Sequence, residues 1–499
     1  MVCVRCRDRI GANAWAAMMI AAKHGARGKH AMLRASIVLS LLCTTCGAAF
    51  GDGADDLAAA ISEQNKGHEQ LGIVLYSSAI HDHALSDQNR VVAYYNRADA
   101  YQAEGDYDGA IGDYSELLRL NPRHLWAYSG RADAYWLKGE KGKAIADYSE
   151  VLRRDPWNAW AYCARANVYR SQSDFVHAFA DYDVALRLNP NDAEFYFNRG
   201  TAYTDTSENS KAIADYDQAL RLNPNYVKAY FFRAHAQHIN GNLDRAIADY
   251  TQVLRISRKN AVAYYDRANA YNAKGDVEHA IADYDQALSL SPRNSWAYFN
   301  RAGMHLIQGD YERAITDYQQ SLTLSPNNAD AVFALGCARF FAGRYQEAAE
   351  DFSRSLTMPA DTMLAWSEAG AIADSDAEAK YRLIWRFIAR RRAGQDGTAE
   401  LRDAAAQTGG DGWPSPVIAF FLGKIGGAQL LESTADVDAA RQQKKSCEAA
   451  AYLGETEFLA RDHAAALPHL QQAREQCPRV FIEAALVNAD LNHLASPGH

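Results

Sequence analysis

Seven arginines recur at a fixed spacing of 34 residues through the middle of the chain: Arg97, Arg131, Arg165, Arg199, Arg233, Arg267 and Arg301. An alanine follows each arginine after 13 residues and an aspartate follows it after 16, beginning with Ala110 and Asp113. Both series run one period further than the arginines, to Ala348 and Asp351. A fixed period of this length is typical of stacked-repeat proteins. Such a stack offers a long binding surface rather than one catalytic pocket.

One period, residues 261–294, contains two stretches in which apolar residues have helical spacing. The first stretch ends at Gly275 and the second at Pro292. Glycine tolerates the left-handed backbone with which helices often end, and proline cannot continue a helix. Each period is therefore expected to form two amphipathic helices joined by a tight turn. In two periods the turn residue is serine instead of glycine, at Ser173 and Ser207.

The period resembles that of the tetratricopeptide repeat family. Counted from the start of each repeat, the shared residues are a small residue at position 8, Tyr at 11, Ala at 20, Tyr at 24 and Pro at 32. Eight contiguous repeats span residues 91–362. The resemblance implies an all-α fold, a right-handed superhelix of helix pairs (an α-solenoid), which binds a protein or peptide in its concave groove. This chain departs from the family at position 7, which is arginine in seven repeats instead of leucine, and in repeat 8, which has Val332 in place of a tyrosine and its proline one place early at Pro359.

The segments before the repeats are of two kinds. Residues 55–90 have helical apolar spacing and are expected to form a degenerate leading helical pair at the end of the stack. Residues 32–51 carry an apolar run that is too short to cross a bilayer, followed by small residues. This pattern predicts a secretory signal peptide, so that residues 1–51 are an over-extended start plus the signal. Two alternatives remain open: residues 1–31 are a genuine cytosolic tail, or the signal is that of a lipoprotein ending at Cys46.

The composition narrows the partner classes. The chain has a formal net charge of −9 at pH 7 and no basic stripe, which argues against nucleic acid or an anionic membrane as partner. No integral membrane span is predicted in the mature chain. The predicted location is periplasmic or secreted. If the signal is that of a lipoprotein, the protein would instead be anchored to the envelope by a lipid.

The cysteines fall into two groups. Four of the eight precede residue 47 and are expected to leave with the signal; among them, Cys3 and Cys6 form a single CxxC without a second pair, so no zinc site is predicted. Cys447 and Cys477 fall at positions 1 and 31 of a further, degenerate repeat. In an antiparallel helix pair the start of the first helix lies beside the end of the second. We therefore predict a Cys447–Cys477 disulfide, consistent with an oxidising compartment.

After residue 362 the repeat register is lost. Residues 363–446 are predicted to form a helical linker domain, and residues 447–495 a degenerate repeat with a capping helix. This C-terminal third resembles the NlpI-type tetratricopeptide lipoproteins of bacterial envelopes at Leu383-Ile384-Trp385, Trp413 to Gly423, Tyr452 to Glu455 and Phe481-Ile482-Glu483. The resemblance implies a non-enzymatic adaptor that holds envelope proteases or peptidoglycan hydrolases, often as a homodimer. Since this chain has far more repeats and no clear lipobox, the identity of the partner does not transfer.

The family resemblance places positions 2, 5, 9 and 12 of each first helix on the inner face of the stack. The residues predicted to line a partner-binding groove there are Tyr95, Asp99, Trp126, Asp133, Trp136, Trp160, Asn167, Phe197, Thr201, Phe231, His235, Tyr265, Asn269, Asn272, Trp296, Phe299 and Phe333. Aromatic rings can take apolar side chains of a peptide, and asparagine can bond its backbone through both ends of the amide. The alternative is that many of these rings pack between neighbouring helices.

The arginine and aspartate series permit two interpretations. The arginines could form a track for phosphate or an acidic ligand, or they could neutralise the aspartates across each helix pair. We favour the second interpretation, because the two series share one phase and a ladder of ion pairs fixes the register of the helices.

Catalytic motifs are lacking. The chain has no HExxH, no GxSxG and no phosphate-binding glycine loop, and no cofactor or metal site is predicted. The sequence therefore predicts a non-enzymatic protein–protein interaction scaffold of the bacterial envelope. An NlpI-like adaptor is the first alternative, and an enzyme with a site in the C-terminal domain near Trp413 is the least favoured one.

Overall fold

The computed structural model describes residues 52–358, 375–408, 411–477 and 482–495, and it divides into two compact units after Pro224. Within these ranges the chain forms 25 α-helices and no strand. The predicted all-α repeat fold is therefore confirmed. The segment predicted as an over-extended start and signal peptide, residues 1–51, and the displaced Pro359 lie outside the described residues.

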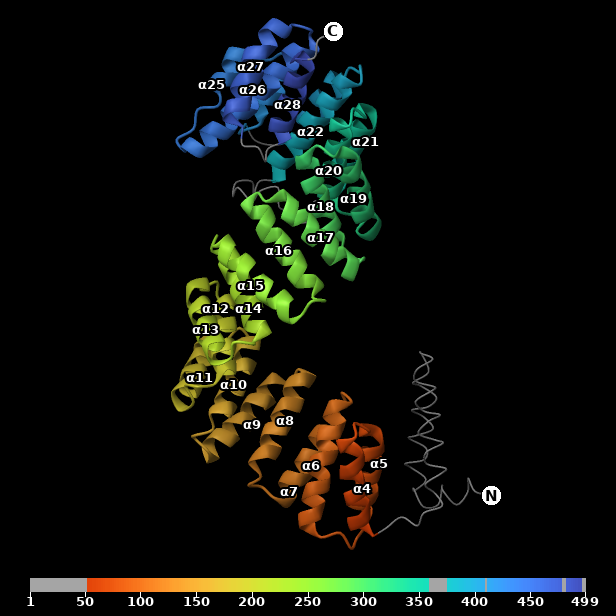
Figure 1. The fold of residues 1–499 in the computed structure, drawn as a ribbon, viewed down its shortest axis with the longest axis vertical. Helices are drawn as coiled ribbons and strands as arrows, with labels where there is room; N and C mark the ends of the chain where they lie inside the picture. Colours follow the sequence, from red (N-terminus) through yellow and green to blue (C-terminus); the bar gives the residue numbers. More distant parts are fainter. Residues whose placement is uncertain (1–51, 359–374, 409–410, 478–481, 496–499) are drawn as a thin grey trace, which may run out of the picture. The chain divides into compact units, whose positions relative to one another are not determined.

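The first unit is a stack of helix pairs in which each helix packs against the next (Figure 1). Its helices are α4 (Gly53–Asn65), α5 (Glu69–His81), α6 (Asp87–Ala103), α7 (Tyr107–Leu120), α8 (Leu125–Lys138), α9 (Lys141–Arg154), α10 (Ala159–Ser171), α11 (Phe175–Leu188), α12 (Ala193–Asp205) and α13 (Asn209–Leu222). The pair α4–α5 corresponds to the predicted leading pair, and α6 to α13 are the helices of repeats 1 to 4.

Two adjacent residues shape the turn inside each repeat. The first has a positive φ, 81° at Gly105 and 89° at Gly139, and it is Ser173 with φ 60° in repeat 3. In repeats 1, 3, 6 and 7 the second is an aspartate that caps the following helix, and in repeat 1 the Asp106 carboxylate accepts a hydrogen bond from the N–H of Gly109 at 2.9 Å. In repeats 1, 6 and 7 the glycine thus ends one helix and the aspartate begins the next.

The core of each repeat combines small and large residues at fixed positions. The alanines at positions 8 and 20, such as Ala98 and Ala110, are fully buried where two helices cross. The tyrosine at position 24 fills the remaining space and is at most 1% exposed in Tyr114, Tyr148 and the later repeats. A larger residue at the alanine positions would force the helices apart, because protein interiors are close-packed.

Each register arginine forms a two-pronged ion pair with the aspartate 16 residues later in the same repeat. In repeat 1, Arg97 Nε and Nη2 donate to the two carboxylate oxygens of Asp113, both at 2.7 Å. The same arrangement, at 2.6–2.9 Å, joins Arg131 to Asp147, Arg165 to Asp181, Arg199 to Asp215, Arg233 to Asp249, Arg267 to Asp283 and Arg301 to Asp317. The structural interpretation of the two series is confirmed.

The third donor of the arginine reaches the preceding helix pair. Arg97 Nη1 donates to Ser77 Oγ at 2.8 Å and Arg131 Nη1 to Ser115 Oγ at 3.0 Å. Equivalent acceptors in repeats 3, 4, 6 and 7 are Ser149, Asp183, Thr251 and Asp285. The guanidinium of Arg97 also lies 5.7 Å from the ring centroids of Tyr94 and Tyr101, within range of cation–π attraction. One arginine therefore joins the two helices of its repeat and connects them to the repeat before.

The second unit begins with repeats 5 to 8. Their helices are α14 (Val227–Ile239), α15 (Leu243–Ile256), α16 (Ala261–Lys274), α17 (Val277–Leu290), α18 (Ser295–Gln308), α19 (Tyr311–Leu324), α20 (Ala329–Phe341) and α21 (Tyr345–Thr357). Repeat 8 has Leu335 in place of the register arginine. Its aspartate, Asp351, accepts instead from Arg339 Nη1 at 2.7 Å, four residues further along the helix. In repeat 8 the arginine that pairs with the aspartate is therefore at position 11 instead of position 7, one helical turn later. Position 11 is a tyrosine in repeats 1 to 4.

The chain continues with helices outside the 34-residue register. They are α22 (Ser375–Arg392), α23 (Thr398–Ala405), α24 (Ser415–Phe421), α25 (Gly427–Glu432), α26 (Ala439–Leu459), α27 (His463–Gln476) and α28 (Ile482–Ala495). Helix α22 packs against α21, and α28 packs against both α26 and α27. The predicted boundary at residue 447 lies inside α26, because residues 439–446 contain no helix breaker and Asp438 caps the helix.

The degenerate repeat in α26 and α27 brings two cysteines together. The Sγ atoms of Cys447 and Cys477 are 2.09 Å apart, and their Cα atoms are 5.0 Å apart. This is the pairing that the repeat phase predicts, because residues 447 and 477 lie at the open end of a helix pair. The other described cysteines, Cys163 and Cys337, are buried and unpaired.

A buried carboxyl group lies where α26 meets α22. Glu448 is 1% exposed, and its Oε2 accepts hydrogen bonds from Tyr381 Oη at 2.7 Å and from Trp413 Nε1 at 2.6 Å. Burial, aided by the negative charge of Glu483, raises the pKa of Glu448 to about 8, although Lys444 and the two donors act in the opposite direction. The group is therefore held largely neutral at pH 7.

Glu448→Gln is expected to stabilise the protein at about pH 7.5. Between the unfolded pKa of roughly 4.5 and the folded pKa of about 8, the folded state binds more protons than the unfolded state, so the stability of the wild type falls as pH rises. Glutamine keeps an oxygen acceptor for Tyr381 and Trp413 without titrating. We expect the free energy of unfolding to rise by about 1–3 kcal/mol at pH 7.5 and to change little near pH 4.5.

Urea unfolding at both pH values measures this difference. Glu432→Gln, which removes an exposed carboxylate, is the matched control and should change stability at neither pH. Equal effects of Glu448→Gln at the two pH values would contradict the assignment of a raised pKa.

Candidate functional site

The predicted groove residues lie on the first helix of each repeat and divide into three groups by position. Those at position 5 pack a ring against the buried ring at position 24 of the same repeat, with centroids 5.2–6.0 Å apart: Tyr95, Phe197, Phe231, Tyr265, Phe299 and Phe333. Phe197 is 9% exposed and Phe299 is 5% exposed. These rings are largely part of the repeat core, as the alternative interpretation supposed.

The polar residues at position 9 mostly serve the same buried tyrosine. The hydroxyls of Tyr114 and Tyr148 donate to the carboxylates of Asp99 and Asp133. The hydroxyls of Tyr182 and Tyr284 donate to Asn167 Oδ1 at 2.5 Å and to Asn269 Oδ1 at 2.7 Å. In repeat 4, Thr201 Oγ1 donates to the carbonyl of Phe197 at 2.9 Å, and in repeat 5 His235 is exposed. The residue at position 9 therefore often accepts the hydrogen bond of the buried tyrosine, in addition to lying on the inner face.

The residues at positions 2 and 12 have the fewest structural contacts of the three groups. Trp126, Trp160 and Trp296 at position 2 are 68%, 46% and 39% exposed. Trp136 and Asn272 at position 12 are half-buried. Exposed tryptophans at the same position of consecutive repeats are a typical feature of protein interfaces, since a large apolar surface in water is costly.

In the first unit these groups form one surface, which we call the aromatic–acidic face: Tyr95, Asp99, Trp126, Asp133, Trp136 and Trp160. The ring of Trp160 lies 6.1 Å from that of Tyr148, whose hydroxyl bonds to Asp133. The ring of Tyr95 lies 5.9 Å from that of Tyr114, whose hydroxyl bonds to Asp99. The face thus runs across the first helices of repeats 1 to 3.

The two carboxylates of this face are electrostatically unusual. Burial raises the pKa of Asp99, and burial together with the nearby charge of Asp99 raises the pKa of Asp133 to about 6, against the effect of the Tyr148 hydrogen bond. The register aspartates Asp113 and Asp147 are at least as buried, but each faces an arginine. Among residues 52–224, neither Asp99 nor Asp133 has an ion-pair partner.

The inner face of the second unit contains polar residues at position 6, outside the predicted groove positions. Asn300 Nδ2 donates to Tyr265 Oη at 3.2 Å and to Asn269 Oδ1 at 3.1 Å in the preceding repeat. Asp266, also at position 6, has its pKa raised to about 6 by burial. The recurrence of Asn or Asp at this position was the available signal.

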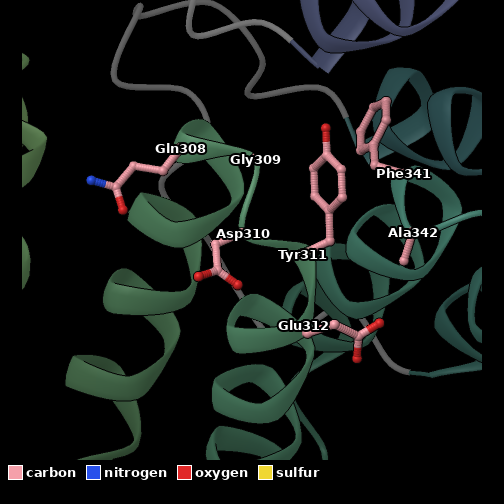
Figure 2. A pocket seen from close by; sticks show the side chains of 7 residues that line it. All are labelled: Gln308, Gly309, Asp310, Tyr311, Glu312, Phe341 and Ala342. Carbon is pink, nitrogen blue, oxygen red and sulfur yellow. The ribbon is translucent and has the colours of Figure 1, made fainter.

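The described surface also has shallow hollows between the turns of successive repeats. The hollow in Figure 2, of about 610 Å³, lies between the turn Gln308–Glu312 and the end of α20 at Phe341 and Ala342. The rings of Tyr311 and Phe341 stack at 5.9 Å on one side of it. It is wide open and lies at the turns, and no catalytic constellation lines it.

The described residues contain no group of three or more His, Cys, Asp and Glu side chains arranged to hold a metal ion. None of their helices combines the length and the apolar character that a membrane crossing requires.

Comparison with known families identifies the repeats. Models described as "Tetratricopeptide repeat" match residues 95–159, 265–329, 193–226 and 215–248, and one described as "TPR repeat" matches residues 166–207. No curated protein matches the chain.

Solved structures with similar repeats include three crystal structures. A tetratricopeptide repeat protein from Parabacteroides merdae is 21% identical over 49% of this chain and 97% of its own, with a TM-score of 0.38. YrrB, described as a TPR protein with an unusual peptide-binding site, is 24% identical over 37% and 95%, with a TM-score of 0.33. PilW, described as a type IV pilus biogenesis factor, is 18% identical over 41% and 94%, with a TM-score of 0.38.

Proposed function

The chain belongs to the tetratricopeptide repeat family, and we propose from this that it is a non-enzymatic scaffold that binds a protein or peptide partner on the inner faces of its first helices. The observation that carries the proposal is the pair Trp126 and Trp160, two large apolar side chains exposed at the same position of consecutive repeats. Buried structural roles account for most of the other predicted groove residues, but not for these two. Interface energy is concentrated in such aromatic anchors.

Affinity capture with the full-length protein tests the proposal. Partners captured from an envelope extract are identified by mass spectrometry, and the affinity of the purified partner is then measured for the wild type and for Trp126→Ala/Trp160→Ala. We expect the double variant to bind at least about tenfold more weakly. Val176→Ala, which truncates an 80% exposed apolar residue on a second helix, is the control and should bind like the wild type. Equal affinity of the double variant would contradict this placement of the binding surface.

The envelope location is part of the proposal. It is supported by the signal-like segment 32–51 and by the pairing of Cys447 with Cys477, which suits an oxidising compartment. The protein partner, and a homodimer if one forms, would then meet the scaffold outside the cytoplasm. Fractionation of cells that express the protein tests the location: recovery of the intact, uncleaved chain in the cytoplasm would contradict it.

A narrower role is that of an NlpI-like adaptor that modulates an envelope protease or peptidoglycan hydrolase. Of the residues that carry this resemblance, Trp385, Phe421 and Tyr452 pack in one hydrophobic cluster, which favours a similar C-terminal arrangement. A protease or hydrolase as the dominant captured partner would support the adaptor. The enzyme alternative near Trp413 gains no support, because that indole is bonded to the buried Glu448.

A further inference from the structure

The aromatic–acidic face contains negative charge that the chain itself does not balance. Every register aspartate of repeats 1 to 4 receives two hydrogen bonds from an arginine, whereas Asp99 and Asp133 each receive one from a neutral tyrosine. Both side chains are half-buried, so they are partly withdrawn from water and still reachable from the surface. Burying a charged carboxylate away from water costs free energy when no cation lies beside it. A cation supplied by a ligand would reduce that cost.

The tryptophans of the same face supply the complementary apolar surface. Trp126 and Trp160 are exposed one repeat apart, and Trp136 lies one helical turn beyond Asp133 on α8. The face of an indole ring attracts an ammonium or guanidinium group, most strongly where water is excluded. The aliphatic stem of lysine or arginine packs well on such rings while its charged end reaches a carboxylate.

We infer that the aromatic–acidic face binds a lysine or arginine side chain of the partner, with its stem against Trp126 and Trp160 and its cation between Asp99 and Asp133. This inference rests on the proposed partner-binding function and names the chemistry that the partner must present. A ligand bound through apolar contacts alone is a different occupant, which the experiment below separates from a basic one.

The charge state of the face makes the binding dependent on pH. The titratable groups around Asp133 are Tyr95 and Asp99 on α6, Tyr114 on α7 and Tyr148 on α9, and Cys163 on α10 lies beside Tyr148. Burial raises the pKa of each of these groups, so the tyrosines and the cysteine stay neutral at physiological pH. Affinity for a cation should therefore be greatest above the Asp133 pKa of about 6 and fall as pH drops through it.

The experiment uses the full-length protein and two peptide libraries. One library places a single lysine or arginine among apolar residues, and the other has acetyl-lysine or citrulline at the same place. Binding is measured by fluorescence anisotropy at about pH 7.5 and about pH 5. We expect the basic library to contain binders at least about tenfold tighter than their uncharged counterparts, and weaker at the lower pH.

The decisive variant is Asp99→Asn/Asp133→Asn. The chain itself has asparagine at this position in Asn167 and Asn269, where the amide oxygen accepts the same tyrosine hydrogen bond, so the variant should keep its fold. We expect it to bind the basic peptides about tenfold more weakly. Asp87→Asn/Asp108→Asn removes the same charge from two exposed sites and should leave binding unchanged.

Each outcome bears on the inference. Unchanged affinity of Asp99→Asn/Asp133→Asn, equal binding of the two libraries, or no binding of either library would overturn it. If the captured partner is lost from Trp126→Ala/Trp160→Ala but kept by Asp99→Asn/Asp133→Asn, the proposed function stands and the inference falls. If both variants keep the partner, the proposed function falls as well.

Discussion

Arg267→Leu is expected to lower the free energy of unfolding by about 3–5 kcal/mol. Asp283 is 6% exposed, and Arg267 Nε and Nη2 donate to both of its oxygens at 2.6 and 2.8 Å. Leucine, the residue that the family usually has at this position, would leave that carboxylate buried without its cation. It would also remove the bond from Arg267 Nη1 to Thr251 in the preceding repeat. Denaturant unfolding followed by circular dichroism measures the loss.

The chain offers its own rescue variant. Repeat 8 combines Leu335 with Arg339, and Arg339 donates to Asp351 at 2.7 Å. Arg267→Leu/Tyr271→Arg reproduces that arrangement in repeat 6 and should recover part of the lost stability. Recovery should be incomplete, because burial raises the pKa of Asp351 to about 6 even with Arg339 beside it. A loss below about 1 kcal/mol for Arg267→Leu alone would show that the pair adds little.

Cys447→Ser/Cys477→Ser is expected to destabilise the C-terminal helices by about 3–4 kcal/mol. The pair closes a loop with a sequence separation of 30, and a cross-link of that length removes much of the freedom of the unfolded chain. Cys447 is fully buried, so its serine replacement also places a hydroxyl in an apolar cluster with Ala450 and Leu470. Thermal unfolding of the oxidised wild type and of the variant measures the difference.

Reduction of the wild type separates the loss of the cross-link from the effect of the serine side chains on stability. Adding a reductant to the wild type opens the cross-link without changing the side chains, so most of the loss should appear there too. The same reductant should leave the variant unaffected, since the remaining described cysteines are unpaired. Two free thiols in the protein purified from an oxidising compartment would contradict the pairing.

The sequence predicts most of the architecture because each repeat position has one dominant physical role. A buried alanine such as Ala110, a turn glycine such as Gly105 and an arginine paired to an aspartate follow from periodicity and simple sterics. The pairing of Cys447 with Cys477 follows from the same phase.

The inner face could be predicted only in part. Position and residue type cannot show that the hydroxyl of Tyr114 reaches back to Asp99, or that Phe299 is covered by its neighbours. Both depend on how helices pack in three dimensions. The recurrence of Asn or Asp at position 6 indicates a polar role, but only the packing of the helices shows that Asn300 reaches Tyr265 and Asn269 of the preceding repeat. The predicted boundary at residue 447 falls inside α26, because this helix extends a repeat helix by eight further residues with no local signal for a break.

Six of the seven register arginines donate a hydrogen bond to the helix pair before their own repeat, which gives the array a direction. Serine, threonine and aspartate all accept that bond, so a duplication or deletion of one whole 34-residue repeat still meets a suitable acceptor. The series ends at both sides: Ser77 of the leading pair receives the bond of the first arginine, and Leu335 of repeat 8 has nothing to donate. The array can therefore change its length between these two residues while its ends stay the same, and the reach of its binding surface can change in steps of one repeat.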